Sequence, residues 1–485
     1  MNAATTWLSR NVARLMGGDS KNADAGAGGA AAGKEAPPRS THDRLEATLR
    51  RSGEALSPRA LRRLLTDLQE VVAPRVSEVE GGRRAEAIAQ WYAEASPEER
   101  RDLWLLMCEQ FTPDAARVKN AQQKYEAAVG TPDAPQAEAA LRRVLTSPRT
   151  RLLQRFSAFP QGMRFLVDLR AEFLPHLKGD KRLMPLEAEL EQLFATWFDV
   201  AFLDLRRLSW DSPASLIEKL IKYEAVHDIR SWADLKNRLD SDRRCYGFFH
   251  PRLPNEPLIF VEVALVTEMS ASITPLLDES AAAADLNKAT TAIFYSISNT
   301  QTGLRGVSFG DSLIKHVAET LAEEFPRLKR FATLSPIPGF RSWLGKHFAQ
   351  QLQLLDEKRL GELGRAVGFE PPQAAHVMAA AEASALELDA KSPVRQFVTE
   401  CAARYLGREM ADDKPVDPVA RFHLGNGARV ERLNWAGDPS SKGQKQSFGM
   451  MVNYLYDLKR IDKHRAMLAE GRVPVSSEID ALCRD

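Results

Sequence analysis

The hydrophobic pattern changes part-way along the chain, and this change limits the folds that the chain can adopt. From about residue 42 to 195 the pattern is helical, and strand patterns are scarce. Ser-Pro or Thr-Pro pairs recur there, and each can start a helix, because the hydroxyl caps free backbone amides and proline suits the first helical position. We therefore expect several antiparallel helices and no catalytic cluster in this region. The pairs are Ser57-Pro58, Ser96-Pro97, Thr112-Pro113, Thr131-Pro132 and Ser147-Pro148.

After Ser212-Pro213, which starts one more helix, short apolar segments predict β-strands. Residues 256–266 ("EPLIFVEVALV") and 290–298 ("TTAIFYSIS") are rich in β-branched and aromatic residues, and they are too short for buried helices. Helical periodicity returns at 311–325, and "RFATL" at 330–334 predicts another short strand. The order strand, loop, helix, strand predicts a sheet domain whose loop could carry chemistry.

The length of 485 residues exceeds what one hydrophobic core usually organises. We predict an α+β protein with an N-terminal all-α helical bundle and a mixed α/β catalytic domain. The boundaries are a disordered tail at 1–41, the bundle at 42–204, which serves assembly, and the catalytic domain at 205–485. Residues 345–412 are rich in Ala, Leu, Gln and Glu, and they predict helices inserted between the two halves of the sheet domain.

Composition excludes several classes of protein. A formal net charge of +1 with intermixed signs argues against nucleic acid or an anionic membrane as the main partner. No apolar run approaches the ~20 residues that a membrane span needs. The N-terminus faintly resembles an organelle presequence, but an unstructured tail is the favoured interpretation. The cysteines lie far apart without ligand spacing, which argues against zinc and disulfides and favours a reduced compartment: Cys108, Cys245, Cys401 and Cys483.

The loop between the predicted strand and helix, "NTQTGLRGVSFGD" at 299–311, has the outline of an anion site. Gly303, Gly306 and Gly310 allow close approach of a ligand to the backbone, and Arg305 adds a positive charge. The helix that follows directs its free amides and positive dipole end toward the loop. Taken alone, the pattern fits phosphate binding and an ordinary turn equally well, because glycine-containing loops of this kind are common.

Three motifs together resemble the malonyl-CoA decarboxylase family: "FYSISNTQTGLRGVSFGDSLIKHV", "TLSPIPGF" and "FHLGNGARVERLNW". The similarity continues through "GMMVNYLYDL" and covers most of residues 212–458. The family's catalytic half resembles the GNAT acetyltransferases, whose pyrophosphate loop pattern falls on Arg305, Ser308 and Gly310, with Ser308 replacing a glycine. The resemblance implies a GNAT-like fold here and CoA or malonyl contacts from Arg305, Gly306, Val307, Ser308, Phe309, Gly310, Asp311, Ser335 and His423.

The resemblance also implies catalytic residues. It assigns His423 as proton donor and Ser335 as proton acceptor, and it implicates Tyr456 more weakly, since an aromatic residue at helical spacing is more often part of a core. Because a free serine hydroxyl is a poor base, we interpret Ser335 as a hydrogen-bonding relay. From the local sequence alone, both Ser335 and His423 would read as ordinary loop residues. We expect Gly425 and Gly427 to turn the chain behind His423 and to hold its ring at a sheet edge, where a pKa near 6.5 would suit proton transfer.

The implied function is decarboxylation of malonyl-CoA to acetyl-CoA and CO2 without metal, biotin or pyridoxal phosphate. Two alternatives stay open: a GNAT-type acyltransferase that moves an acyl group from CoA to an amine, and a non-catalytic helical interaction protein that binds acyl-CoA. The resemblance suggests a homodimer or homotetramer. We expect a bacterial-type cytoplasmic protein, with the mitochondrial matrix as the second choice.

Overall fold

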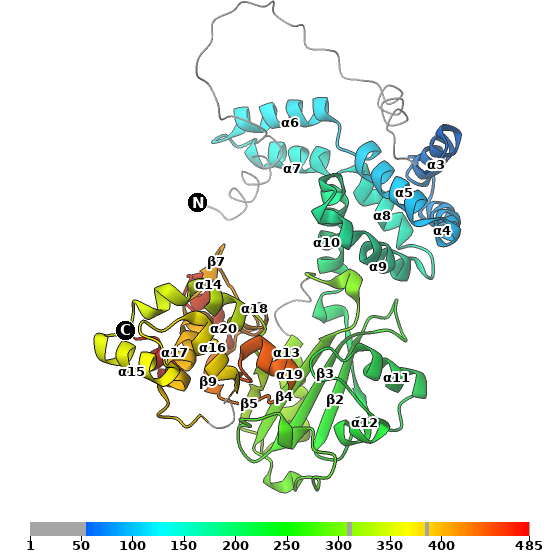
Figure 1. Cartoon of the computed structure of the whole chain (residues 1–485). Helices are drawn as coiled ribbons and strands as arrows, with labels where there is room; N and C mark the ends of the chain where they lie inside the picture. The colour runs from blue at the N-terminus through cyan, green and yellow to red at the C-terminus, as the bar shows by residue number, and fades with distance from the viewer. Residues whose placement is uncertain (1–54, 308–312, 384–387, 485) are drawn as a thin grey trace, which may run out of the picture. The chain divides into compact units, whose positions relative to one another are not determined.

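A computed structural model describes residues 55–307, 313–383 and 388–484 (Figure 1). The disordered tail expected at 1–41 lies outside these residues and stays a prediction. The boundary expected between residues 204 and 205 also stays a prediction. None of the helices in the described ranges combines the length and apolar character that crossing a membrane requires.

The first part of the described chain is helical, as the sequence predicts. Ser57 and Ser96 cap α3 and α5, and Ser96 forms a full capping box with Glu99. The prediction that helices start at Thr112 and Thr131 was wrong, because Asp114 caps α6 and α7 begins at Ala134. The helices are α3 (Pro58–Val71), α4 (Glu78–Glu94), α5 (Pro97–Gln110), α6 (Ala115–Ala128), α7 (Ala134–Leu145), α8 (Pro148–Phe156), α9 (Gly162–Phe173) and α10 (Met184–Trp197).

An eight-stranded mixed sheet follows, with the order β1-β2-β3-β4-β5-β10-β6 and with β9 paired to β10. β4 and β5 are parallel and are joined by α13 (Leu313–Glu324), whereas the other pairs are antiparallel. The predicted strand–loop–helix–strand order is confirmed. The strands are β1 (Asp204–Leu208), β2 (Arg243–Phe249), β3 (Pro257–Val266), β4 (Thr291–Asn299), β5 (Arg330–Thr333), β6 (Ser335–Pro336), β9 (Arg429–Asn434) and β10 (Met451–Tyr456).

Helices cover both faces of the sheet. On one face α11 (Ala214–Tyr223) and α12 (Trp232–Arg238) lie beside β2 and β3 (Figure 1), and Leu220 and Leu235 pack with Phe260. On the other face α13 reaches β2, where the rings of His316 and Phe248 lie 6.2 Å apart. The core is therefore a mixed sheet packed between two helical layers.

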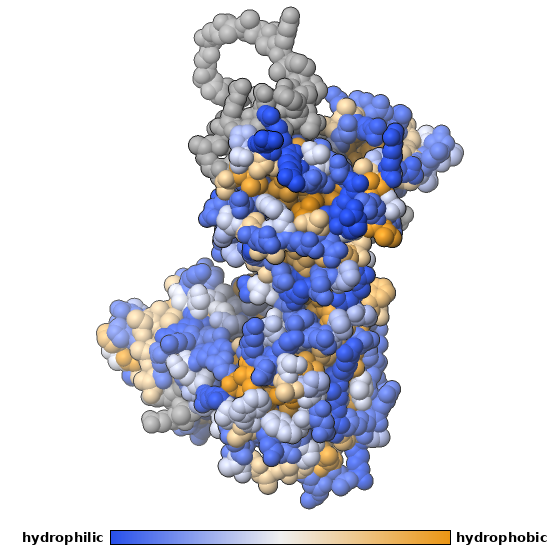
Figure 2. Space-filling model, turned by 90° about the vertical axis from the view of Figure 1, so that its right-hand side faces the viewer, coloured by the Kyte–Doolittle hydropathy of each residue, from blue (hydrophilic) through white to orange (hydrophobic). Residues whose placement is uncertain are grey.

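A helical insertion separates β6 from β9, as predicted. It contains α14 (Phe340–Leu352), α15 (Glu357–Val367), α16 (Ala374–Ala383) and α17 (Pro393–Gly407), followed by the small hairpin β7 (Met410–Ala411) and β8 (Lys414–Pro415). The remaining helices are α18 (Pro418–Gly425), α19 (Ser441–Ser447), α20 (Ile461–Ala469) and α21 (Ser477–Leu482). Figure 2 shows one face of the molecule, which is mainly hydrophilic with smaller hydrophobic areas between the charged ones.

Candidate active site

Three residues that are far apart in the sequence meet in one buried cluster. Ser335 Oγ lies 3.2 Å from His423 Nε2, and the other ring nitrogen, Nδ1, lies 2.8 Å from the Tyr456 hydroxyl oxygen. All three side chains are buried. The structure therefore brings together the three residues that the family resemblance implies as catalytic.

His423 lies on a helix and not at a sheet edge, so the expected placement was wrong. Asp417 caps α18 by accepting from the amides of Val419 and Ala420 at 2.9 and 3.0 Å, and His423 falls in the last turn of that helix. The turn does follow directly. Gly427 adopts a φ of +83°, and a Cβ there would lie 2.6 Å from Ile461, so this position requires glycine.

Ser335 and Tyr456 come from neighbouring strands. Tyr456 lies on β10, so the interpretation of its spacing as helical was wrong. Its ring contacts Phe294 of β4 with centroids 6.3 Å apart. Ser335 begins β6, and its hydroxyl also donates to Thr333 Oγ1 at 2.9 Å. The site thus lies where β5, β6 and β10 meet, with α18 supplying the imidazole.

The electrostatics of the site differ from the expectation for a histidine near pKa 6.5. Burial lowers the pKa of His423 to about 3, so the ring is neutral at physiological pH. Burial also raises the pKa of the Tyr456 hydroxyl well above its ordinary value, so this group keeps its proton. The ring of Tyr454 stacks on the imidazole at a centroid distance of 4.7 Å. A neutral imidazole held by hydroxyl groups is suited to donating a hydrogen bond or a proton to a developing anion.

Sequence reasoning missed Thr333, Asn453 and Tyr454, which support the cluster. All three are fully buried. Thr333 Oγ1 accepts from the Tyr454 amide at 3.1 Å, and the Thr333 carbonyl accepts from Asn453 Nδ2 at 2.7 Å. The threonine within "RFATL" was part of a correctly predicted strand, but a strand pattern does not show which residue faces an active site.

The predicted CoA loop is only partly described. Arg305 and Gly306 are exposed and Val307 is buried, whereas Ser308, Phe309, Gly310 and Asp311 lie outside the described residues. Gly303 does not fit the expected role. It lies in a short 3-10 turn, Thr302–Leu304, and a Cβ there would lie 1.9 Å from the Val167 carbonyl oxygen, so its close approach is to α9.

Arg170 of α9 fixes the start of this loop. It is almost completely buried, and its Nη1 donates to the carbonyl oxygens of Gly303 and Arg305 at 2.6 and 3.0 Å. Its other donors form a bidentate pair with Glu187 of α10 at 2.8 and 2.6 Å. The helices before the sheet thus position the start of the predicted phosphate-binding loop. The capping residues and hydrophobic stripes of these helices did not indicate this contact.

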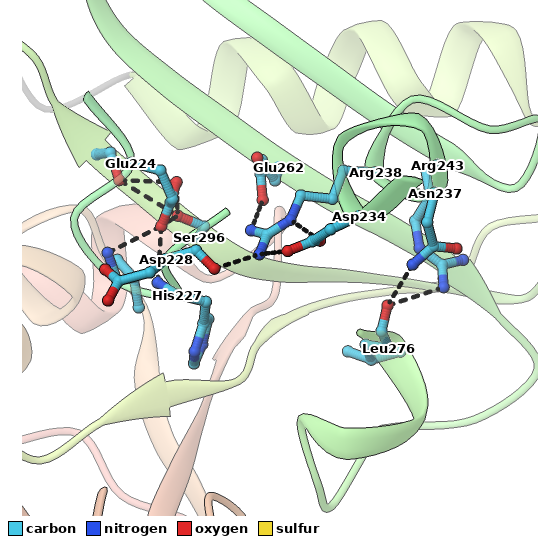
Figure 3. A network of polar contacts seen from close by, with 12 residues as sticks. Glu224, His227, Asp228, Asp234, Asn237, Arg238, Arg243, Glu262, Leu276 and Ser296 are labelled. Atoms are coloured by element: carbon cyan, nitrogen blue, oxygen red, sulfur yellow. Dashed lines mark hydrogen bonds and ion pairs between the residues drawn. The ribbon is translucent and has the colours of Figure 1, made fainter. Parts of the chain in front are cut away.

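A second buried polar network lies where α12 packs against β3 (Figure 3). Arg238 binds Asp234 at 2.7 Å and Glu262 at 3.1 Å. Glu224 accepts from the hydroxyls of Ser296 and Ser298. Burial and the neighbouring Glu224 raise the pKa of Glu262 to about 8. Within the described ranges no group of His, Cys, Asp or Glu could hold a metal ion, and all four cysteines are free.

Comparison with known proteins identifies the family. Two family models match, the malonyl-CoA decarboxylase N-terminal domain at residues 111–198 and the malonyl-CoA decarboxylase C-terminal domain at 201–485. The chain belongs to the malonyl-CoA decarboxylase family. It is 37% identical over 350 residues to the mitochondrial malonyl-CoA decarboxylase of Anser anser anser, a match that covers 67% of each chain.

Solved structures agree with this membership. The malonyl-CoA decarboxylase of Cupriavidus metallidurans is 43% identical and has a TM-score of 0.73, over 87% of this chain and 100% of that one. The corresponding protein of Rhodopseudomonas palustris is 38% identical with a TM-score of 0.74, over 87% and 99%. The chain therefore belongs to a family of carboxy-lyases.

Proposed function

We propose that this member of the malonyl-CoA decarboxylase family converts malonyl-CoA to acetyl-CoA and CO2, with Ser335 and His423 acting on the malonyl group. The observation that carries the proposal is the contact of 3.2 Å between Ser335 Oγ and His423 Nε2 in a buried cluster of hydroxyl groups. Family membership supports the choice of substrate. The relation to GNAT acetyltransferases stays a prediction.

The reaction needs little beyond hydrogen-bond donors and a proton. As CO2 leaves, the thioester carbonyl accepts the electron pair, so we propose that no metal, biotin or pyridoxal phosphate takes part. The enolate that forms must be stabilised at its oxygen and then protonated at its carbon. Donors in a buried site are effective here, because water does not compete with them.

His423 and Ser335 can divide these tasks. The pKa of about 3 makes His423 a neutral imidazole, which can donate a hydrogen bond to the enolate oxygen or its proton to the carbon. Ser335, beside it, can orient the malonyl carboxylate. Tyr456 holds the far side of the ring and does not itself need to touch the substrate.

We propose that residues Arg305 to Asp311 hold the CoA phosphates, mainly through backbone amides. Support comes from the exposed Arg305 and Gly306 at the described start of this loop, which precedes α13 in the sequence. Arg170 holds the carbonyl oxygens of Gly303 and Arg305 at the described start of this loop.

The decisive experiment gives the purified protein malonyl-CoA without any acyl acceptor and detects CO2 and acetyl-CoA. The His423→Gln variant serves as the matched control. A transferase would need an amine acceptor and would release no CO2, and a binding protein would form neither product. A folded wild-type protein that binds CoA but releases no CO2 would refute the proposal.

Assembly and location are also proposals. We propose a homodimer or homotetramer, which light scattering on the full chain would test. The relative from Anser anser anser is named as mitochondrial, and the relatives of known structure come from bacteria. We therefore keep the cytoplasm of a bacterium as the first choice and the mitochondrial matrix as the second.

A further inference from the structure

The hydrogen bonds around His423 have a direction that begins at a backbone amide. The N–H of Tyr454 can only donate, and it points to Thr333 Oγ1 at 3.1 Å. Ser335 donates its hydroxyl proton to the same oxygen at 2.9 Å. Because a serine hydroxyl has one proton, the oxygen of Ser335 then faces His423 Nε2 as an acceptor.

This direction decides where the imidazole carries its proton. A neutral imidazole has one N–H and one bare nitrogen, and the partner of each nitrogen selects between the two forms. With Ser335 accepting, Nε2 must hold the proton, and Nδ1 accepts from the Tyr456 hydroxyl at 2.8 Å. We propose that Thr333 is a positioning residue that fixes His423 in the tautomer protonated on Nε2.

The place of Thr333 in the sheet explains why it can do this. The ladder between β10 and its neighbours is interrupted, since Leu455 pairs with Ala332 of β5 and Val452 pairs with Ser335 of β6. At the interruption the amide of Tyr454 donates to the Thr333 side chain, and the Thr333 carbonyl accepts from the side-chain amide of Asn453. A break in strand pairing thus places a hydroxyl oxygen beside the serine.

Without this acceptor the opposite arrangement would be equally available. Ser335 could donate to Nε2, and the proton on Nδ1 could be given to the Tyr456 oxygen. Only the Nε2–H form presents a proton on the side of Ser335, where the proposed function places the malonyl group. The consequence for turnover rests on that proposed function, whereas the tautomer itself does not.

The proton transfer balances in this form. The Nε2–H bond breaks as the enolate electron pair forms the new C–H bond of acetyl-CoA, and the Tyr456 hydroxyl donates to the ring meanwhile. A proton from solvent then restores Nε2–H. The overall reaction consumes one proton for each CO2 released, as decarboxylation of a carboxylate requires.

The test compares wild type, Thr333→Val and Thr333→Ser by nitrogen-15 NMR of labelled histidine, with His423→Gln used to assign the resonances. Valine has a similar shape but no acceptor oxygen, and serine retains the oxygen. We expect the His423 proton on Nε2 in wild type and Thr333→Ser, and on Nδ1 or on both nitrogens in turn in Thr333→Val. We also expect Thr333→Val to lower kcat by about 10- to 100-fold with little change in KM. This loss is smaller than that expected for removing a general acid. Thr333→Ser should retain most of kcat.

A wild-type ring protonated on Nδ1, or on both nitrogens, would overturn the inference, as would an unchanged tautomer in Thr333→Val. If Thr333→Val does not fold, Thr333→Ala, which also lacks the acceptor oxygen, replaces it in the comparison. Failure of the proposed function has a different signature: no CO2 from malonyl-CoA, with the Nε2 tautomer in place.

Discussion

Replacing Glu262 with glutamine should make the protein less sensitive to alkaline pH. Glu262 lies on β3 and is completely buried. Its Oε2 is 3.1 Å from Arg238 Nη1, and its Oε1 has no hydrogen-bond partner among the described residues. With a pKa raised to about 8 by burial and by Glu224, the carboxyl group is protonated at neutral pH, and Asp234 remains the counter-ion of Arg238.

The magnitude follows from linkage between protonation and folding. In the unfolded chain Glu262 titrates near its ordinary pKa of 4.5. Between that value and about 8 the folded protein therefore holds one more proton than the unfolded chain, so the free energy of unfolding falls as the pH rises. The fall is about 1.4 kcal/mol per pH unit, or about 3 kcal/mol between pH 5.5 and 7.5. Glutamine is similar in size, keeps an acceptor for Arg238 and does not titrate, so this contribution disappears.

Urea unfolding of wild type and Glu262→Gln at several pH values measures the difference between their free energies of unfolding. Groups that are the same in both proteins contribute equally and do not affect this difference. The matched control is Glu382→Gln at an exposed pair, where Arg341 lowers the carboxyl pKa. A lowered pKa contributes stability that is lost only as the pH falls, so this control should keep the wild-type alkaline slope. Equal slopes in wild type and Glu262→Gln, with the variant about 3–5 kcal/mol less stable at every pH, would show that Glu262 is an ionised partner of Arg238 and refute the reasoning.

Further predictions concern the site and its loop. His423→Gln should lower turnover by about 10²–10⁴-fold with CoA binding nearly unchanged, and adding Ser335→Ala should cost little more; wild-type turnover with a lowered melting temperature would instead make His423 structural. Arg170→Met should destabilise the protein by about 3 kcal/mol and weaken CoA binding measured by calorimetry, because the partly buried Glu187 carboxylate loses its buried partner; unchanged stability and affinity would contradict this. Gly303→Ala should lower the melting temperature more than Gly306→Ala, since a Cβ at Gly303 meets a carbonyl oxygen at 1.9 Å, whereas one at Gly306 meets open space and adds only the strain of a φ of +81°; similar losses would mean that the contact at Gly303 relaxes freely.

Local patterns predicted the elements of the sheet domain well. The β-branched segments at 256–266 and 290–298 became β3 and β4, and the helical insertion was found from composition. These patterns succeed because they report which side chains must be buried within one element. The Asp417-Pro418 cap was an equally clear signal for α18, and reading it would have placed His423 on a helix.

The polar contacts between elements could not be predicted in this way. Ser335 and His423 are 88 positions apart, and only the family resemblance suggested that they act together. The contact of Arg170 with the predicted CoA loop joins positions 133 and 135 residues apart. Such pairs depend on how strands and helices are arranged, and neither hydrophobic period nor capping residues encode that arrangement.

The glycine turn after His423 has a different role from the one predicted from the sequence. Asp417 starts α18 and the helix ends two residues beyond His423, so the ring is presented from a short, rigid element. Gly427, at a φ of +83°, then lets the chain reverse into β9, which pairs with β10. β10 in turn carries Tyr454, which stacks on the imidazole, and Tyr456, which binds Nδ1. The turn therefore does not expose the histidine: it brings the chain back into β9, whose partner β10 covers the ring, and the resulting burial keeps the imidazole neutral.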